Sequence, residues 1–283
     1  MDSAWSLAGL RLVSPDSQGL VVVPPLVGGT ALQAIDLFRT LRSHGMDIAS
    51  FDYSGHGSSG GRFSLGQSIL DTGAALRFFA SECRRDGQAL FGAGMSYGTI
   101  PLLTSAASTG WPLQGIVVMN GLLDVRGVLS WRRFARTHLV QAAAGGSARK
   151  IFWRALAAYL QELLPGVPKD LHTFGALNYG RVRVLRTIAE FLFGQPLRRV
   201  RIPEATPVLA YCGHSDGLLR FELPTFYRSY EARLRGICAS LEIRRAALDH
   251  FGRGPDRRRV AQEVGVWLSN RAGAASGRPG QRH

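Results

Sequence analysis

Short apolar runs alternate with longer amphipathic stretches along most of the chain. The runs expected to form strands span residues 7–13, 19–23, 47–51, 89–93, 115–119, 206–212 and 240–246. The stretches expected to form helices span residues 31–43, 68–83, 101–107, 221–235 and 256–270. The run Leu20–Val23 is continuous and rich in β-branched residues, as in a strand covered on both faces. The alternation predicts an α/β fold, with a mostly parallel, doubly wound sheet between two helical layers.

The alternation stops between residues 124 and 201. Helical patterns are joined there by Gly145-Gly146 and by Pro165–Pro168, and no strand pattern appears. We interpret residues 124–201 as a helical cap insertion above the sheet, with residues 1–123 and 202–270 forming the core domain. Residues 271–283 contain few apolar side chains, and we expect them to be a disordered tail.

Composition narrows the class of protein. Hydrophobic residues make up 46% and charged residues 19% of the chain, which is ordinary for a globular domain. No apolar run approaches the ~20 residues of a membrane span, and no secretory leader is recognised at the N-terminus. The widely spaced Cys83, Cys212 and Cys238 suit a reducing compartment. We therefore predict a cytoplasmic protein. With no metal-ligand spacing and no dinucleotide motif, we expect no cofactor or metal.

Positive charge is concentrated in the predicted cap. The whole chain has a formal net charge of +14. Residues 125–201 hold fourteen Arg and Lys residues but only three acidic ones, Glu162, Asp170 and Glu190. A field of this kind can attract an anionic ligand or partner, although solvated helix faces would account for the arginines as well. The chain has no nucleic-acid recognition motif, and we expect no nucleic-acid partner.

The segment Ala89–Ile100 carries the pattern with the most chemistry. An apolar run leads into Gly94-Met95-Ser96-Tyr97-Gly98, and a helical pattern follows. A G-x-S-x-G turn between a strand and a helix holds its serine in a strained corner with the hydroxyl exposed. Such a short pattern also arises by chance in a chain with 34 glycines, and it becomes informative only together with a base and an acid.

The order of Ser96, Asp216 and His250, each following a predicted strand, resembles the α/β-hydrolase family over residues 10–270. The resemblance extends to serine esterases, thioesterases and members with a serine aminopeptidase-type cap. It implies a sheet of the α/β-hydrolase type and a catalytic triad. Ser96 would be the nucleophile, His250 the base and Asp216 the orienting acid.

Other residues compete for two of these roles. Asp124 follows another predicted strand, where some members of the family place the acid. Asp249 is the nearest carboxylate to His250 along the chain, but the side chain of a directly preceding residue usually points away from its neighbour's site. His56 lies in a glycine-rich loop and His214 beside the predicted acid, which makes both of them rival bases.

The oxyanion site departs from the family pattern. One donor is expected to be the backbone N–H of Tyr97, directly after the serine. The other should come from the loop after residue 23, where many relatives carry His-Gly and this chain has Pro25-Leu26-Val27. Pro25 has no N–H to donate. The resemblance implies Val27, which corresponds to the position of the usual donor, with Leu26 as the second choice.

The predicted activity is that of a serine hydrolase cleaving an acyl ester or acyl thioester through an acyl-serine intermediate. Large apolar side chains in the insertion suggest a hydrophobic acyl group, namely those of Trp131, Phe134, Leu139, Phe152, Trp153, Leu156, Tyr159, Phe174, Phe191 and Phe193. The arginines suggest an anionic carrier, such as coenzyme A or an acidic acyl carrier protein. Two alternatives are an acyltransferase with an alcohol or amine acceptor and a non-catalytic binding protein.

Overall fold

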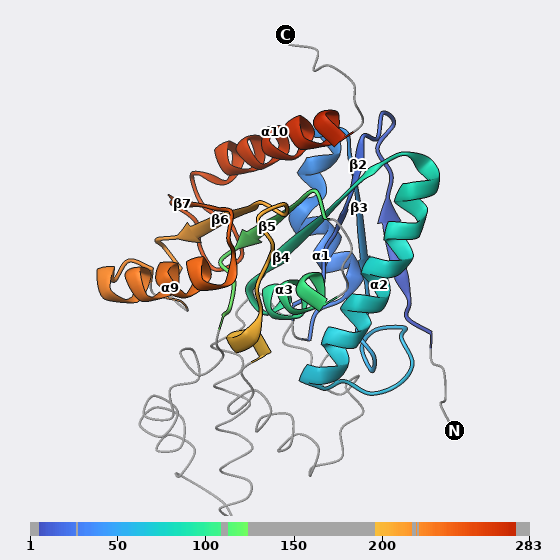
Figure 1. The fold of residues 1–283 in the computed structure, drawn as a ribbon, viewed down its shortest axis with the longest axis horizontal. Helices are drawn as coiled ribbons and strands as arrows, with labels where there is room; N and C mark the ends of the chain where they lie inside the picture. Colours follow the sequence, from blue (N-terminus) through green and yellow to red (C-terminus); the bar gives the residue numbers. More distant parts are fainter. Residues whose placement is uncertain are drawn as a thin grey trace, which may run out of the picture.

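One seven-stranded sheet forms the centre of the molecule (Figure 1). The computed structural model describes residues 6–26, 28–108, 113–123, 196–216, 219 and 221–275. The strands lie in the order β1-β3-β2-β4-β5-β6-β7, and only the β1–β3 pair is antiparallel. Their bounds are β1 Gly9–Leu12, β2 Gly19–Val22, β3 Met46–Phe51, β4 Ala89–Met95, β5 Gly115–Met119, β6 Val208–Gly213 and β7 Leu241–Ala246. The prediction of a mostly parallel sheet is confirmed.

Helices cover both faces of the sheet (Figure 1). One face carries α1 (Ala31–Phe38), which continues as the 3-10 helix η1 (Arg39–His44), and α10 (Arg257–Ala275). The other face carries α2 (Leu65–Asp86), α3 (Thr99–Ser108) and α9 (Pro224–Ile237). Two further 3-10 turns are η2 (Ser96–Gly98) and η5 (Pro196–Arg199).

The continuous apolar character of the central strands follows from this double covering. In β2, Leu20 and Val22 belong to the hydrophobic cluster on the α2 side of the sheet. Val21, between them, belongs to the cluster on the α1 side. Successive side chains of a strand point to opposite faces, and here both faces are dry. A central strand of this sheet therefore cannot show polar alternation.

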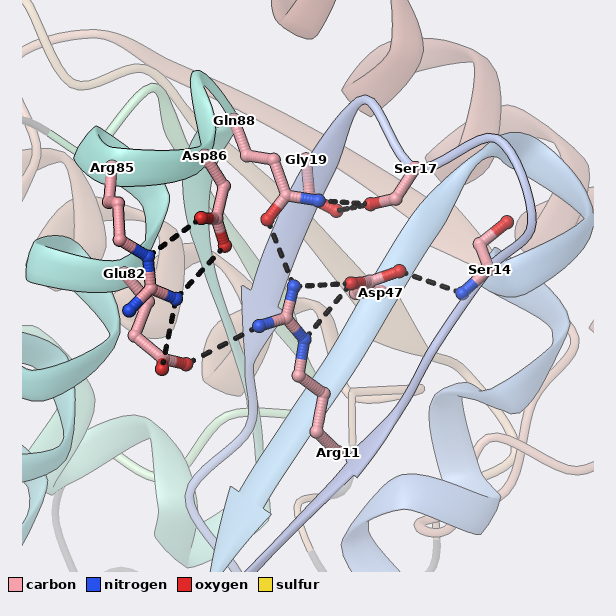
Figure 2. Close-up of polar contacts among 9 residues, drawn as sticks. All are labelled: Arg11, Ser14, Ser17, Gly19, Asp47, Glu82, Arg85, Asp86 and Gln88. Atoms are coloured by element: carbon pink, nitrogen blue, oxygen red, sulfur yellow. Dashed lines mark hydrogen bonds and ion pairs between the residues drawn. The ribbon is translucent and has the colours of Figure 1, made fainter.

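The antiparallel edge strand β1 is held by a polar cluster at one end of the sheet (Figure 2). Arg11 donates to the carboxylate of Asp47 on β3 through Nε at 3.0 Å and Nη2 at 2.6 Å. Asp47 has no solvent exposure, and its other oxygen accepts from the backbone N–H of Ser14 at 2.7 Å. Arg11 also reaches Glu82 and Gln88, at and just beyond the end of α2. These contacts join β1, β3 and α2.

Two predicted boundaries need correction. Helix α10 continues to Ala275, which means that residues 271–275 are helical and not part of a disordered tail. Val264, Leu268 and Ala272 are buried at successive turns, and this apolar stripe carries the helix past residue 270. Leu197 and Val200 are buried in the core cluster, placing residues 196–201 with the core and not with the cap. Residues 124–195, the rest of the predicted cap, and residues 276–283 lie outside the described residues.

The strand order brings two loops together. β2 lies between β3 and β4, and the chain therefore leaves β2 toward one side of the sheet and later returns on the other. In an open parallel sheet, ligands bind outside the carboxyl ends of the strands at such a switch point. The loop after β2 and the turn after β4 meet there, which places Pro24 and Pro25 beside Gly98.

Candidate active site

Ser96 occupies the sharp turn between β4 and α3. Its φ of +49° lies in the left-handed region, which is uncommon for a residue with a side chain. Glycine at position 98 is required by space, because a Cβ atom there would lie 2.6 Å from the carbonyl oxygen of Pro24. At position 94 a Cβ would approach the Cα of Thr99 to 2.9 Å. The glycines on either side of the serine thus allow the turn to pack against the helix and the loop after β2.

Three side chains far apart in sequence form a hydrogen-bonded chain at the carboxyl ends of the strands. His250 Nε2 lies 2.7 Å from Ser96 Oγ, and His250 Nδ1 lies 2.8 Å from Asp216 Oδ2. Asp216 has no solvent exposure, and its Oδ1 accepts from the backbone N–H of Leu219 at 2.9 Å. In this geometry the imidazole can take the serine proton at Nε2 while the carboxylate holds Nδ1–H.

The loop that carries His250 is folded around Asp249. The Oδ1 atom of Asp249 accepts from the backbone N–H groups of Phe251 at 2.9 Å and Arg253 at 2.8 Å. Its backbone N–H donates to the carbonyl of Arg253 at 2.6 Å. The carboxylate of Asp249 therefore shapes the loop, whereas Asp216 bonds to the imidazole.

The two rival histidines, His56 and His214, lie outside this hydrogen-bonded chain. His214 is exposed on the turn after β6. His56 is buried, and its Nε2 accepts from the backbone N–H of Gly28 at 3.2 Å. Burial lowers the pKa of His56 to about 4, against the opposing effects of the Ser54 backbone and the Asp52 carboxylate. His56 is consequently neutral near pH 7 and supports the loop after β2. Asp124, the rival acid, lies outside the described residues.

Buried side chains also hold the predicted oxyanion loop. The hydroxyl of Tyr53 donates to the carbonyl of Pro25 at 3.1 Å. The backbone N–H of Ala31, at the start of α1, donates to Asp52 Oδ1 at 2.8 Å. Both residues directly follow β3, the strand beside β2. The loop after β2 is therefore fixed at both ends from its neighbouring strand.

The predicted oxyanion residues come from two segments, the turn after β4 and the loop after β2. Tyr97 follows Ser96 in η2, and its buried side chain lies 2.6 Å from Ser68 Oγ on α2, hydroxyl to hydroxyl. Leu26 is half-buried and packs against the cluster on the α1 side of the sheet. Val27 lies outside the described residues. The role of each backbone N–H stays a prediction.

Asn120 is a buried polar residue of this region for which the sequence analysis predicted no role. It follows β5 directly, has a φ of +46° and is 1% exposed. Its side chain bonds to the loops of both Asp216 and His250. The available signal was an Asn-Gly pair at the end of a buried strand, since asparagine tolerates the left-handed region better than most residues.

The described residues contain neither a candidate membrane span nor a candidate metal site. No helix among them is long and apolar enough to cross a membrane. Within the same ranges, no three His, Cys, Asp or Glu side chains are grouped as ligands for a metal ion.

Comparison with known proteins places this geometry in a known fold. No family model and no curated protein sequence matches the chain. A monoacylglycerol lipase of Paleococcus ferrophilus is 17% identical, with a TM-score of 0.54 over 94% of this chain and 99% of its own. A soluble variant of a monoglyceride lipase of Saccharomyces cerevisiae is 16% identical, with a TM-score of 0.62 over 96% and 93%. An esterase of Pyrococcus furiosus is 14% identical, with a TM-score of 0.55 over 94% and 90%.

These solved structures match 94–96% of the chain with TM-scores above 0.5. The protein therefore has the α/β-hydrolase fold, as the resemblance at the level of sequence order implied. At identities of 14–17% the likeness establishes the fold, and the function must be argued from the site.

Proposed function

We propose that the protein is a serine hydrolase that cleaves an acyl ester, with Ser96 as nucleophile, His250 as base and Asp216 as orienting acid. The observation that carries the proposal is the unbroken chain of hydrogen bonds from Ser96 Oγ through His250 to Asp216. The lipases and esterases of the same fold give it additional support.

The reaction requires two acyl transfers. Ser96 Oγ forms a bond to the acyl carbon while its proton passes to His250 Nε2, and the resulting tetrahedral intermediate carries an oxyanion. The bond to the leaving oxygen then breaks, and the leaving group takes the proton from His250. Water repeats the sequence on the acyl-serine, losing a proton to His250 and releasing the carboxylic acid, with Ser96 Oγ reprotonated. Asp216 keeps Nδ1 protonated throughout and stabilises the imidazolium.

The proposed oxyanion donors are the backbone N–H of Tyr97 and one N–H from Leu26 or Val27. Support comes from the close packing of Gly98 against Pro24, which sets the loop after β2 beside the serine turn. Two backbone donors from different segments would stabilise the negative charge as it develops on the carbonyl oxygen. No side chain would be needed at the position where relatives carry His-Gly.

For the substrate we propose a hydrophobic acyl group, attached to an alcohol or, as a thioester, to coenzyme A or an acyl carrier protein. Support comes from sequence alone, because the apolar and arginine side chains of residues 124–195 lie outside the described residues. Arginine binds phosphate and carboxylate through two parallel hydrogen bonds, which suits an anionic carrier.

The test is turnover of p-nitrophenyl acyl esters of increasing chain length, followed by acyl-coenzyme A thioesters. Ser96→Ala should lower kcat by about 10⁴-fold or more, because the nucleophile is gone, while the melting temperature stays near that of the wild type. A fluorophosphonate probe should label the wild type and not the variant. His214→Ala is the matched control and should retain full activity.

Other outcomes point elsewhere. Undiminished turnover by Ser96→Ala would contradict the proposal. Absence of both turnover and labelling in the folded wild type would favour a non-catalytic binding protein. Formation of a new ester or amide when an alcohol or amine is added would identify an acyltransferase that uses the same triad.

A further inference from the structure

The turn after β5 contacts every loop that carries a member of the proposed triad. Asn120 Oδ1 accepts from the backbone N–H of Gly213 at 2.6 Å, at the end of β6. Asn120 Nδ2 donates to the carbonyl of Asp249 at 2.6 Å and to that of His250 at 3.3 Å. Two residues further on, the backbone N–H of Leu122 donates to the carbonyl of Ser96 at 2.9 Å.

The contact with Gly213 extends to the acid. The carbonyl of Gly213 accepts from the backbone N–H of Asp216 at 3.0 Å. Gly213 is thus bonded through its N–H to Asn120 and through its C=O to Asp216. A second hydrogen bond joins the loop of Asp216 to the loop of His250, because the backbone N–H of Ser215 donates to the carbonyl of Leu248 at 3.2 Å. The amide of Asn120 therefore connects two loops that are already near each other.

An amide is the side chain that this position needs. The two carbonyl groups require a donor, the Gly213 N–H requires an acceptor, and both lie within reach of one buried group. The amides of asparagine and glutamine carry both functions on one small planar group, and glutamine is longer by a methylene. The partners also decide the orientation of the amide, since a reversed group would place its oxygen against two carbonyl oxygens.

The backbone at position 120 is held in an unfavourable conformation. A φ of +46° costs most residues roughly 1 kcal/mol or more, and asparagine is among those that adopt it with least penalty. The side chain is 1% exposed, so its hydrogen bonds face no competition from water. The backbone conformation and the hydrogen-bond partners at position 120 therefore both favour asparagine.

We propose that Asn120 is a positioning residue, which fixes the His250 loop and the Asp216 loop in register so that the imidazole reaches Ser96. This inference rests on the proposed function, because its catalytic consequence requires the triad to be active. Asn120 touches neither the acyl group nor the reacting atoms, and it acts through the backbone of the two loops.

Two variants separate the parts of this role. Asn120→Gly keeps the backbone conformation accessible and removes all three side-chain bonds. Asn120→Asp keeps the shape and the acceptor for Gly213, but it places a carboxylate oxygen against the carbonyls of Asp249 and His250. Ser105→Ala is the matched control, since Ser105 is 1% exposed and its hydroxyl bonds to the carbonyl of Ile69, joining α3 to α2.

We expect both Asn120 variants to lower kcat by about 100-fold with little change in KM, because a displacement near 1 Å is enough for such a loss. The pH profile of kcat/KM should shift as well, since the contact between His250 and Asp216 changes. Ser105→Ala should leave kcat and the pH profile at wild-type values. If the separate Ser96→Ala variant is inactive and a folded Asn120→Gly variant keeps wild-type kcat, the inference is overturned and the proposed function stays intact.

Amide hydrogen exchange provides a readout that does not depend on activity. Residues 247–254 should exchange faster in Asn120→Gly and in Asn120→Asp than in the wild type or Ser105→Ala, because the loop loses its anchor. Residues 213–216 should exchange faster in the glycine variant alone. Wild-type exchange in both segments overturns the inference even if the protein proves to be inactive. If the glycine variant does not fold, the aspartate variant decides by the same measurements.

Discussion

Ser96 and Asn120 are the non-glycine residues with positive φ in the part of the chain that the structure describes. Both directly follow a buried strand, Ser96 after β4 and Asn120 after the neighbouring β5. Strained conformations persist only where the surrounding structure holds them, and they concentrate at functional sites. Here the strain turns one hydroxyl toward His250 and one amide toward the loop that carries it.

At the residue scale, Gly98 packs tightly against the backbone of the loop after β2. In Gly98→Ala the new Cβ would lie 2.6 Å from the Pro24 carbonyl oxygen, and backbone must move to relieve the overlap. We expect a loss of stability of about 1–3 kcal/mol and a fall in kcat of tenfold or more, because the loop after β2 would shift away from the serine. Thermal unfolding and ester turnover measure the two effects.

Gly236→Ala is the control for Gly98→Ala. Gly236 is exposed in α9, and a Cβ there would meet no atom within 4 Å. It should raise stability by about 0.5–1 kcal/mol without altering kcat. Equal kcat values for Gly98→Ala and Gly236→Ala would show that the packing of Gly98 against Pro24 is irrelevant to activity.

Among the strands of the sheet, β1 differs most from the others in direction, position and exposure. It is antiparallel at the edge of the sheet, it is four residues long, and Leu10 is 48% exposed. So short a strand has little apolar area with which to pack. The polar cluster of Arg11, Asp47 and Glu82 supplies the missing attachment (Figure 2).

Breaking this cluster should therefore destabilise the element. Asp47→Asn weakens the acceptor for Arg11 in a fully buried place and should cost about 2–3 kcal/mol. The expected cost is at the lower end for a buried ion pair because Arg11 is 25% exposed and keeps Glu82 and Gln88. Urea unfolding measures the loss. Arg39→Ala is the control, since the Arg39–Asp36 pair is exposed, lies outside the cluster and should contribute nothing measurable. Equal midpoints for the two variants would contradict the assignment.

At the scale of the whole molecule, the free energy of unfolding depends on pH through the buried His56. The pKa of His56 is lowered to about 4 in the folded protein, against about 6.5 in an unfolded chain. Between these values the unfolded state binds a proton that the folded state does not. The stability associated with His56 is therefore fully present above pH 6.5 and is lost as the pH falls toward 4.

His56→Gln should reduce this dependence. Integrated over the window, the single group accounts for about 3 kcal/mol in the wild type. Glutamine can still accept from the Gly28 N–H, but it does not titrate. Urea unfolding at pH 7, 5.5 and 4.5 should show a smaller loss of stability in the variant, with other groups contributing equally to both proteins. Parallel curves for the two proteins would refute the assignment of the linkage to His56.

The alternation of apolar runs and helical patterns was enough to predict an α/β sheet covered on both faces, because strand and helix periods are local properties of the chain. The order Ser96, Asp216, His250, each after a predicted strand, could also be recognised in the sequence. The cap, the identity of the second oxyanion donor and the cytoplasmic location stay predictions.

Strand order could not be predicted from these local patterns, because it depends on contacts between residues far apart in the chain. Only the tertiary structure shows β2 between β3 and β4, and only it shows the 2.8 Å contact between His250 Nδ1 and Asp216 Oδ2. Asn120 bonds to residues 93 to 130 positions away, and no periodicity encodes such contacts. The residues and the order of the site were thus set by the sequence, and their geometry by the packing of distant strands.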